Sequence, residues 1–236
     1  MRALILAAGE GRRLRPLTLT TPKPLVEVGG MPMAVRQLLA LKEVGICDIV
    51  MNVAYHSRQI MTALGDGSRW GVRLHYSVEG ECAEEALETL GGIAKALPLL
   101  TADGDDAFIA VASDIVTDFD LGRLVERGMR LRQERRDAHL VLVPNPAYHE
   151  SGDMSLDETG CVRPLPKTRT FASLGVYRAS LFAGVPAERA KLFPWMWRAC
   201  EEGRVSGECF DGRWLNVGDM TELRLAREQF GNKMEQ

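Results

Sequence analysis

The chain has 236 residues, enough for one to two domains of average size. Its 29 Lys and Arg residues nearly balance 32 Asp and Glu residues, and the net charge of -3 argues against non-specific binding of nucleic acid. The sequence contains no apolar run near the roughly 18 residues that a membrane-spanning helix needs, so we expect no contact with a membrane.

Short apolar runs alternate with segments of helical spacing through the first part of the chain. This alternation predicts βαβ units and a largely parallel sheet. The continuous apolar run at 107–112 is typical of a strand that is covered on both faces. We expect strands at 4–6, 48–53, 73–78, 107–112 and 138–143, and helices at 33–45, 56–64, 86–97 (ended by Pro98) and about 120–135.

The pattern changes after Pro144, where strands become shorter and more frequent. We expect a hairpin at 154–163, strands at 171–177, 205–210 and 214–217, and helices at about 190–202 and 219–231. The sequence thus predicts an α/β fold with a doubly wound, mostly parallel sheet and a small β-rich lobe. We expect one domain over 1–236, with a nucleotide-binding part at about 1–144 and a sugar-binding part at about 145–236.

The most informative segment is a glycine loop that follows the first predicted strand. Gly9 and Gly11 allow the backbone to turn its N–H groups toward an anion, and several arginines follow them. Lys23 lies between two prolines, which fix the local backbone. The glycines taken alone are typical of an ordinary turn from strand to helix. The loop is not a dinucleotide-binding fingerprint, because Leu14 occupies the place of its third glycine.

The combination of Leu6-Ala-Ala-Gly-x-Gly-x-Arg-Leu with Pro22-Lys-Pro-Leu resembles the signature of the sugar-phosphate nucleotidylyltransferases. Further segments resemble the branch that contains the N-acetylmuramate α-1-phosphate uridylyltransferases: 65–71, 76–80, 87–98, 145–153, 205–208 and 214–218. The resemblance implies a Rossmann-like fold and a magnesium-dependent transferase of peptidoglycan recycling. It would make an NDP-sugar and pyrophosphate from an NTP, here UTP, and a sugar 1-phosphate.

The resemblance also implies the roles of individual residues. It assigns catalysis to Arg13, Lys23 and Asp114, and the metal to Asp114 and Asn216. It places Glu88, Asn145, Asp153 and Lys167 at the sugar phosphate. The nucleotide site would comprise Leu6, Ala7, Ala8, Gly9, Gly11, Arg13, Lys23, Glu79, Thr89, Gly91 and Gly92. An alternative role for Asp114 is a helix cap, and for Asp153 a carboxylate in a hairpin turn.

Several positions depart from the family pattern. Asn216 stands where the family has a metal-binding Asp, Leu90 replaces a glycine, and Ala112-Ser113 precedes Asp114 in place of Asn-Gly. Asp219 could offer a carboxylate in place of the one missing at Asn216. Two alternatives therefore stay open: a guanylyl or other nucleotidylyltransferase of surface-polysaccharide synthesis, and a nucleotide-binding homologue with weakened catalysis. The five scattered cysteines form no CxxC motif and predict reduced thiols in a cytoplasmic protein, whose oligomeric state the sequence leaves open.

Overall fold

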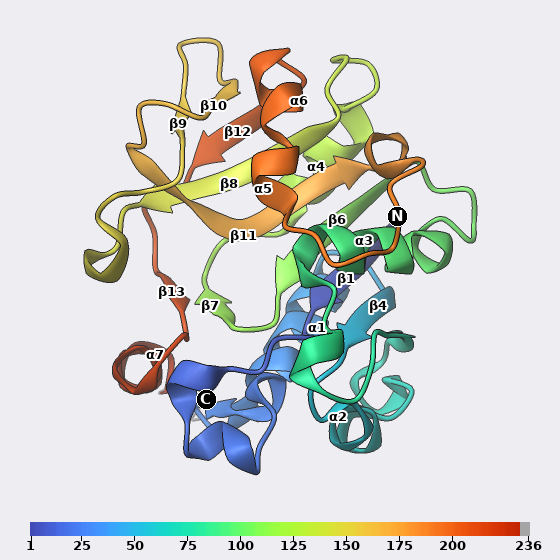
Figure 1. The fold of residues 1–236 in the computed structure, drawn as a ribbon, viewed down its shortest axis with the longest axis vertical. Coiled ribbons are helices and arrows are strands. Elements are labelled where there is room, and N and C mark those ends of the chain that lie inside the picture. Colours follow the sequence, from blue (N-terminus) through green and yellow to red (C-terminus); the bar gives the residue numbers. More distant parts are fainter. Residues whose placement is uncertain (232–236) are drawn as a thin grey trace.

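The structure, a computed structural model, describes residues 1–231. Its main feature is a seven-stranded sheet with the strand order β12-β8-β11-β6-β1-β4-β5 (Figure 1). Each predicted strand of the first part of the chain is present within one or two residues of its expected ends. The sheet strands are β1 (Arg2–Leu6), β4 (Asp48–Val53), β5 (Arg73–Val78), β6 (Ala107–Ala112), β8 (Ala138–Pro144), β11 (Arg169–Arg178) and β12 (Val205–Cys209).

Most neighbouring strands in this sheet are parallel, as predicted. β1 runs parallel to β4 and β6, β4 to β5, and β8 to β12, whereas β11 is antiparallel to both of its neighbours. The register aligns Leu6 at the end of β1 with Asn52 of β4 and with Ala112 of β6. The carboxyl ends of these strands therefore meet at one edge, where ligands bind in open α/β sheets.

Helices cover both faces of the sheet, which confirms the doubly wound architecture. One face packs against α1 (Met33–Glu43), α2 (Ser57–Leu64) and α4 (Gly122–Arg130). The other face packs against α3 (Glu88–Leu100), α5 (Leu192–Trp195) and α6 (Trp197–Glu201). Burial on both faces explains why β6 has a continuous apolar sequence instead of an alternating one.

A third, smaller apolar cluster fixes the glycine loop to the C-terminal part of the chain. Leu14 from the loop packs with Val217 and Leu223, and all three are almost fully buried. Figure 1 shows α7 beside the N-terminal segment, although the two lie far apart in the sequence. The small elements of this region are β2 (Glu27–Val28), β3 (Met31–Pro32), β7 (Ile115–Thr117), β13 (Trp214–Asn216) and α7 (Met220–Phe230).

The β-rich segment after Pro144 is divided between a small separate hairpin and the central sheet. The predicted hairpin is present as β9 (Ser155–Leu156) and β10 (Val162–Arg163), but β11 and β12 join the central sheet. β11 inserts between β6 and β8 and so brings the later segment to the edge where β1, β4 and β6 end. The division into nucleotide-binding and sugar-binding parts stays a prediction.

Two helix boundaries differ from the expectation because of proline. α3 continues past Pro98 to Leu100, since one missing N–H is offset by the complete burial of Leu100. The helix expected over 190–202 is split into α5 and α6. A further interruption lies inside α5, where Phe193 precedes Pro194 and has extended angles of φ -108° and ψ 135°, as the ring of a following proline requires.

α4 ends at Arg130, so it is shorter than the helix expected at about 120–135. Within residues 1–231, no helix has both the length and the apolar character needed to span a membrane. All five cysteines are free thiols, as the sequence predicts.

Candidate functional site

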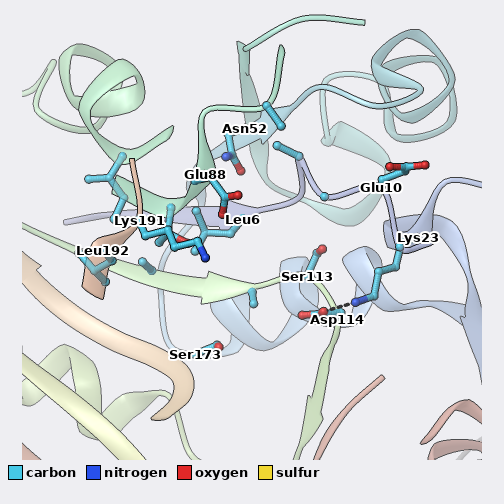
Figure 2. Close-up of a pocket in the computed structure, with 18 of the residues that line it drawn as sticks. Leu6, Glu10, Lys23, Asn52, Glu88, Ser113, Asp114, Ser173, Lys191 and Leu192 are labelled. Atoms are coloured by element: carbon cyan, nitrogen blue, oxygen red, sulfur yellow. Dashed lines mark hydrogen bonds and ion pairs between the residues drawn. The ribbon is translucent and has the colours of Figure 1, made fainter. Parts of the chain in front are cut away.

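A long cleft opens at the carboxyl ends of β1, β4 and β6. It has two halves, of about 690 and 650 Å³, which share the lining residues Phe171, Ser173, Phe193 and Asn216. We call these four residues the junction. We call the larger half the glycine-loop half and the other the aromatic half; Figure 2 shows the former. Two polar ligands of moderate size would meet at the junction.

The backbone of the glycine loop faces the larger half. Gly11 has φ +69°, and a Cβ at this position would lie 3.1 Å from side-chain atoms of Lys23 and Thr18. A side chain there would be strained and crowded, so the position favours glycine. Within residues 1–231, the N–H groups of Gly9, Glu10 and Gly11 donate no hydrogen bond. They are therefore available to an anion that enters the cleft.

Lys23 and Asp114 form an ion pair on the wall of this half (Figure 2). Lys23 begins the short helix Lys23–Leu25, which the flanking prolines stiffen, and Asp114 directly follows Ser113 after β6. Their side chains are only 13% and 20% exposed. The lysine is thus held beside the carboxylate, where it can turn to a phosphate that enters the cleft.

Asn216 lies next to Asp114 because β13 pairs with β7. Asn216 is opposite Ile115, and the N–H of Val217 donates to the carbonyl of Asp114 at 2.9 Å. The Oδ1 atom of Asn216 is buried and has no hydrogen-bond partner among the described residues. A buried amide oxygen without a partner is costly unless a ligand satisfies it. Asp114 and Asn216 together offer the oxygen ligands that Mg²⁺ prefers.

Asp219 does not replace the carboxylate that Asn216 lacks. It accepts hydrogen bonds from the N–H groups of Thr221 and Glu222 at 2.9 and 3.0 Å, and so caps the N-terminus of α7. Within residues 1–231, no group of three or more His, Cys, Asp or Glu side chains is placed to hold a metal. A metal here would depend on a few oxygen ligands together with its substrates.

A chain of hydrogen bonds behind the glycine loop links β1 to the start of α3. The N–H of Ala7 donates to Asn52 Oδ1 at 2.8 Å, and Asn52 Nδ2 donates to Glu79 Oε1 at 2.6 Å. Glu79 Oε2 then accepts from the N–H of Leu87 at 2.7 Å. Burial raises the pKa of the Glu79 carboxyl, although these donors oppose the shift. Glu79 is therefore a positioning residue beneath the cleft.

The variant Glu79→Gln should lower the free energy of unfolding by about 1–3 kcal/mol, because glutamine cannot accept from both Asn52 and Leu87. Urea denaturation at neutral pH measures this change. Glu81→Gln is the matched control, since Glu81 is 61% exposed and its ion pair with Arg58 contributes little. Equal stability of the two variants would contradict the positioning role.

Gly91 and Gly92 lie below the surface of the cleft. A Cβ on Gly91 would lie 1.9 Å from the carbonyl oxygen of Glu188, and one on Gly92 would lie 2.6 Å from Glu79 Oε1. Both glycines therefore allow close packing inside the protein. Leu90, which replaces a glycine of the family pattern, is only 3% exposed and packs in the core, so its side chain does not line the cleft.

The aromatic half combines ring surfaces with polar groups. Trp197 and Trp214 line it, and Trp214 is held by a hydrogen bond from Nε1 to the carbonyl of Ala172 at 3.0 Å. Burial raises the pKa of Tyr148 to about 12, so its hydroxyl stays protonated. Asp153 accepts from the N–H of Phe171 at 2.9 Å and contacts His149 Nε2 at 2.8 Å. Such a site suits a ligand with a hydrophobic ring face and several hydroxyl groups.

The structure brings most of the predicted site residues to the cleft, but not always to the expected half. Arg13 lines the aromatic half, with its guanidinium against Gly218. Glu88 lines the glycine-loop half, 3.5 Å from Arg189. The predicted residues in the glycine-loop half are Leu6, Ala8, Gly9, Gly11, Lys23, Thr89, Asp114 and Asn216, and those in the aromatic half are Asp153 and Lys167.

Asn145 uses its side chain within the protein. Its Nδ2 donates to the carbonyls of Glu150 and Lys167 at 3.1 and 3.3 Å, and its Oδ1 accepts from Thr170 at 3.0 Å. It holds two loops beside the aromatic half together and does not line that half. Its predicted contact with a sugar phosphate stays a prediction.

Several lining residues were not anticipated from the sequence. Lys191 and Arg189 add positive charge to the glycine-loop half, and Figure 2 shows Lys191 near Glu88. Arg12, which also lines this half, and the exposed Arg15 both pair with Glu10. Arg189 and Lys191 belong to an irregular segment that contains no recognisable sequence motif, so the sequence did not indicate their place in the site. Only the tertiary fold places this segment over α3, through the hydrogen bond from Leu90 to Ala190 at 2.9 Å.

Comparisons with known proteins give consistent results. The family model described as nucleotidyl transferase matches residues 2–232. An N-acetylmuramate α-1-phosphate uridylyltransferase of Neisseria meningitidis is 44% identical, over 98% of this chain and 99% of that protein. A glucose-1-phosphate thymidylyltransferase of Streptomyces griseus is 30% identical, over 94% of this chain and 64% of that protein. The catalytic subunit beta of a mannose-1-phosphate guanylyltransferase from Drosophila pseudoobscura is also 30% identical, over 92% of this chain and 59% of that protein.

A solved structure confirms the fold. A Bacillus anthracis protein, assigned as a glucose-1-phosphate thymidylyltransferase and crystallised with sucrose, superposes with a TM-score of 0.83. The match covers 98% of this chain and 96% of that one, at 20% sequence identity. Similarity at this level of identity supports the architecture alone.

Proposed function

Because the chain belongs to the nucleotidyl transferase family and is a sugar-1-phosphate nucleotidylyltransferase, we propose that it transfers the uridylyl group of UTP to N-acetylmuramate α-1-phosphate. The observation that carries the choice of substrates is the 44% identity to the Neisseria uridylyltransferase along nearly the whole length of both chains. The products are a UDP-sugar and pyrophosphate. We place the reaction in the cytoplasm as a step of peptidoglycan recycling, in keeping with the free thiols.

The two halves of the cleft fit the two substrates. The triphosphate lies along the free N–H groups of the glycine loop, and the nucleoside extends toward Thr89 and Lys191. The sugar 1-phosphate occupies the aromatic half, with its ring against Trp197 or Trp214 and its phosphate near Arg13. The reacting groups then meet at the junction.

The reaction needs in-line positioning more than proton transfer. An oxygen of the sugar phosphate attacks the α-phosphorus of UTP and forms a new P–O bond. The bond between that phosphorus and the oxygen bridging to the β-phosphate breaks, and pyrophosphate leaves with this oxygen. The nucleophile is already anionic, so no general base is required. Lys23 leaves Asp114 and neutralises the phosphate oxygens as the two polyanions approach.

Magnesium fits the oxygen atoms available beside the junction. We assign its protein ligands to the Asp114 carboxylate and to Asn216 Oδ1, which otherwise lacks a partner. When bound, the ion supplies positive charge to the phosphate oxygens. Asp114 also holds Lys23, so the two residues orient each other before substrate binds.

The proposed function is tested by measuring pyrophosphate release with four NTPs against a panel of sugar 1-phosphates. The panel contains the N-acetylmuramate, N-acetylglucosamine, glucose and mannose 1-phosphates. We expect the highest kcat/KM for UTP with N-acetylmuramate α-1-phosphate, by at least about 10-fold. Preference for GTP with mannose 1-phosphate would favour a guanylyltransferase. UTP binding in calorimetry without turnover of any pair would indicate a nucleotide-binding homologue.

The variant Asn216→Asp should lower the half-saturating Mg²⁺ concentration about 10-fold, because a second carboxylate adds charge to the ion's ligands. The measurement is a Mg²⁺ titration of pyrophosphate release at saturating substrates. Asp219→Asn is the matched control: it removes a nearby carboxylate but keeps an oxygen that can cap α7, so it should keep the Mg²⁺ dependence of the wild type. An unchanged titration for Asn216→Asp would refute the assignment of Asn216.

A further inference from the structure

A second pocket lies at the edge of the sheet opposite the cleft. Its volume is about 330 Å³, and it is lined by Asp137, which directly precedes β8, and by Arg204, which directly precedes β12. Because β11 is antiparallel to both β6 and β8, β8 runs parallel to β6, and the amino end of β8 lies away from the cleft. We call this space the amino-edge pocket. Its volume is in the range of sites for small ligands.

An aromatic ring forms one wall of the amino-edge pocket. Trp195 stacks on the fully buried Phe182, with the ring centroids 5.5 Å apart and the ring planes inclined by 20°. Trp195 is nevertheless 37% exposed and lines the pocket, so part of the ring remains open to a ligand. Met196 and Ala199 add a buried apolar floor. A ring fixed in this way is a platform on which a planar ligand can stack.

The charges around this platform leave one basic group with free donors. Asp137 pairs with Arg178 and Arg204, so its negative charge is neutralised within the protein. Arg204 also pairs with Glu202 and has its donors occupied. Arg198 is 87% exposed and donates from Nε to Glu202 at 2.9 Å, an exposed pair that contributes little. Within residues 1–231, the Nη groups of Arg198 donate no hydrogen bond, and such groups suit a phosphate or a carboxylate.

The helices α5 and α6 contribute side chains to both the amino-edge pocket and the cleft. Trp195 and Arg198 line the pocket, whereas Phe193 and Trp197 from the same two helices line the aromatic half. The rings of Phe193 and Trp197 are in contact, with their centroids 4.4 Å apart. Closely packed side chains transmit small displacements instead of absorbing them. A ligand that shifts α5 and α6 from the pocket side therefore moves the aromatic wall of the cleft.

We propose that the amino-edge pocket is a second ligand site, for a planar ring that carries a phosphate or carboxylate group, and that its occupant changes acceptor binding through α5 and α6. The ring stacks on Trp195, and the anionic group binds the Nη atoms of Arg198. The site uses none of the groups assigned to catalysis, so it goes beyond the proposed function. Only its effect on the acceptor rests on that function. A nucleotide and a simple aromatic acid both have the required chemistry.

Phenyl phosphate is a suitable probe, because it has only the ring and the anionic group. Its dissociation constant is measured by calorimetry in the absence of substrates. Arg198→Gln should raise this constant about 10-fold, as for a lost hydrogen bond to a charged group, and Trp195→Leu should raise it several-fold through lost stacking. Arg224→Gln is the matched control, because Arg224 is an exposed arginine of α7 outside the pocket. Thermal unfolding verifies that each variant is folded.

Lack of phenyl phosphate binding would overturn the proposal, and so would equal affinity in the wild type and Arg198→Gln, which would place the probe elsewhere. Phenol should bind at least about 10-fold more weakly than phenyl phosphate, since it lacks the anionic group. Competition with UMP distinguishes the two sources of this chemistry. Displacement of phenyl phosphate by UMP identifies a nucleotide as the ligand, and no displacement identifies an aromatic acid.

The effect on the cleft is measured separately, with whichever substrate pair the wild type turns over best. Saturating phenyl phosphate should change the KM for the acceptor at least about threefold in the wild type but less than about twofold in Arg198→Gln. Without the probe, both proteins should have the same kcat and KM within about twofold, because Arg198 lies outside the cleft. Without turnover, the dissociation constant of the sugar 1-phosphate replaces its KM. An equal response in both proteins would overturn the link through α5 and α6.

Discussion

Replacing Lys23 with methionine should lower kcat about 10²–10³-fold, the usual effect of losing one charge-stabilising donor at a phosphoryl or acyl transfer site. Lys23 is a cation held on the wall of the glycine-loop half, where the triphosphate would lie. Methionine keeps the length of the side chain and removes the charge. Pyrophosphate release at saturating UTP and acceptor measures the loss.

The same substitution should have the opposite effect on metal binding to the free protein. Lys23 occupies the side of Asp114 that faces the cleft, and its removal leaves that carboxylate without a counterion. We therefore expect Mn²⁺, used as a spectroscopic probe without nucleotide, to bind Lys23→Met several-fold more tightly than the wild type. Arg15→Met is the control, because Arg15 is exposed and paired with Glu10. A kcat close to that of the wild type in Lys23→Met would refute the assigned role.

The order and type of the main elements could be predicted because each has a strong local pattern. The apolar run predicted the strand β6, and the spacing of apolar residues predicted the helix α1. Both elements have almost the expected ends in the structure. The helix that continues through Pro98 could not be predicted, since its last turn depends on the burial of Leu100 against the sheet. The insertion of β11 between β6 and β8 also has no local signal.

The sequence predicted roles for the glycine loop, Lys23 and Asp114 from motifs, and the structure brings these residues together along the glycine-loop half. It did not identify Ser173, whose position depends on a mismatch in strand pairing, or Lys191, which comes from an irregular segment. Leu90 departs from the family pattern in the sequence, but its side chain packs in the core and does not line the cleft. The motifs thus predict where phosphates bind, whereas the residues that line the rest of the cleft come together only in the tertiary structure.

The substitution Asp114→Asn should reduce kcat at least about 10²-fold. It leaves two neutral amides, at 114 and 216, where the proposed function needs an anionic ligand for Mg²⁺, and it removes the partner of Lys23. We expect the half-saturating Mg²⁺ concentration to rise as kcat falls, because both depend on the same carboxylate. Turnover within a few-fold of the wild type would show that Asp114 only orders the local backbone.

A second substitution in the same background tests whether charge at this place is what matters. The double variant Asp114→Asn/Asn216→Asp restores one carboxylate, now at position 216 in β13. This strand pairs with β7, which begins directly after Asp114. Because both residues line the glycine-loop half and Val217, next to Asn216, bonds the carbonyl of Asp114, we expect kcat to recover about 10-fold relative to the single variant, without reaching the wild type. Thermal unfolding of both variants verifies that they are folded. Failure of the double variant to exceed Asp114→Asn would mean that the carboxylate is required at position 114 itself, and that Asn216 contributes no metal ligand.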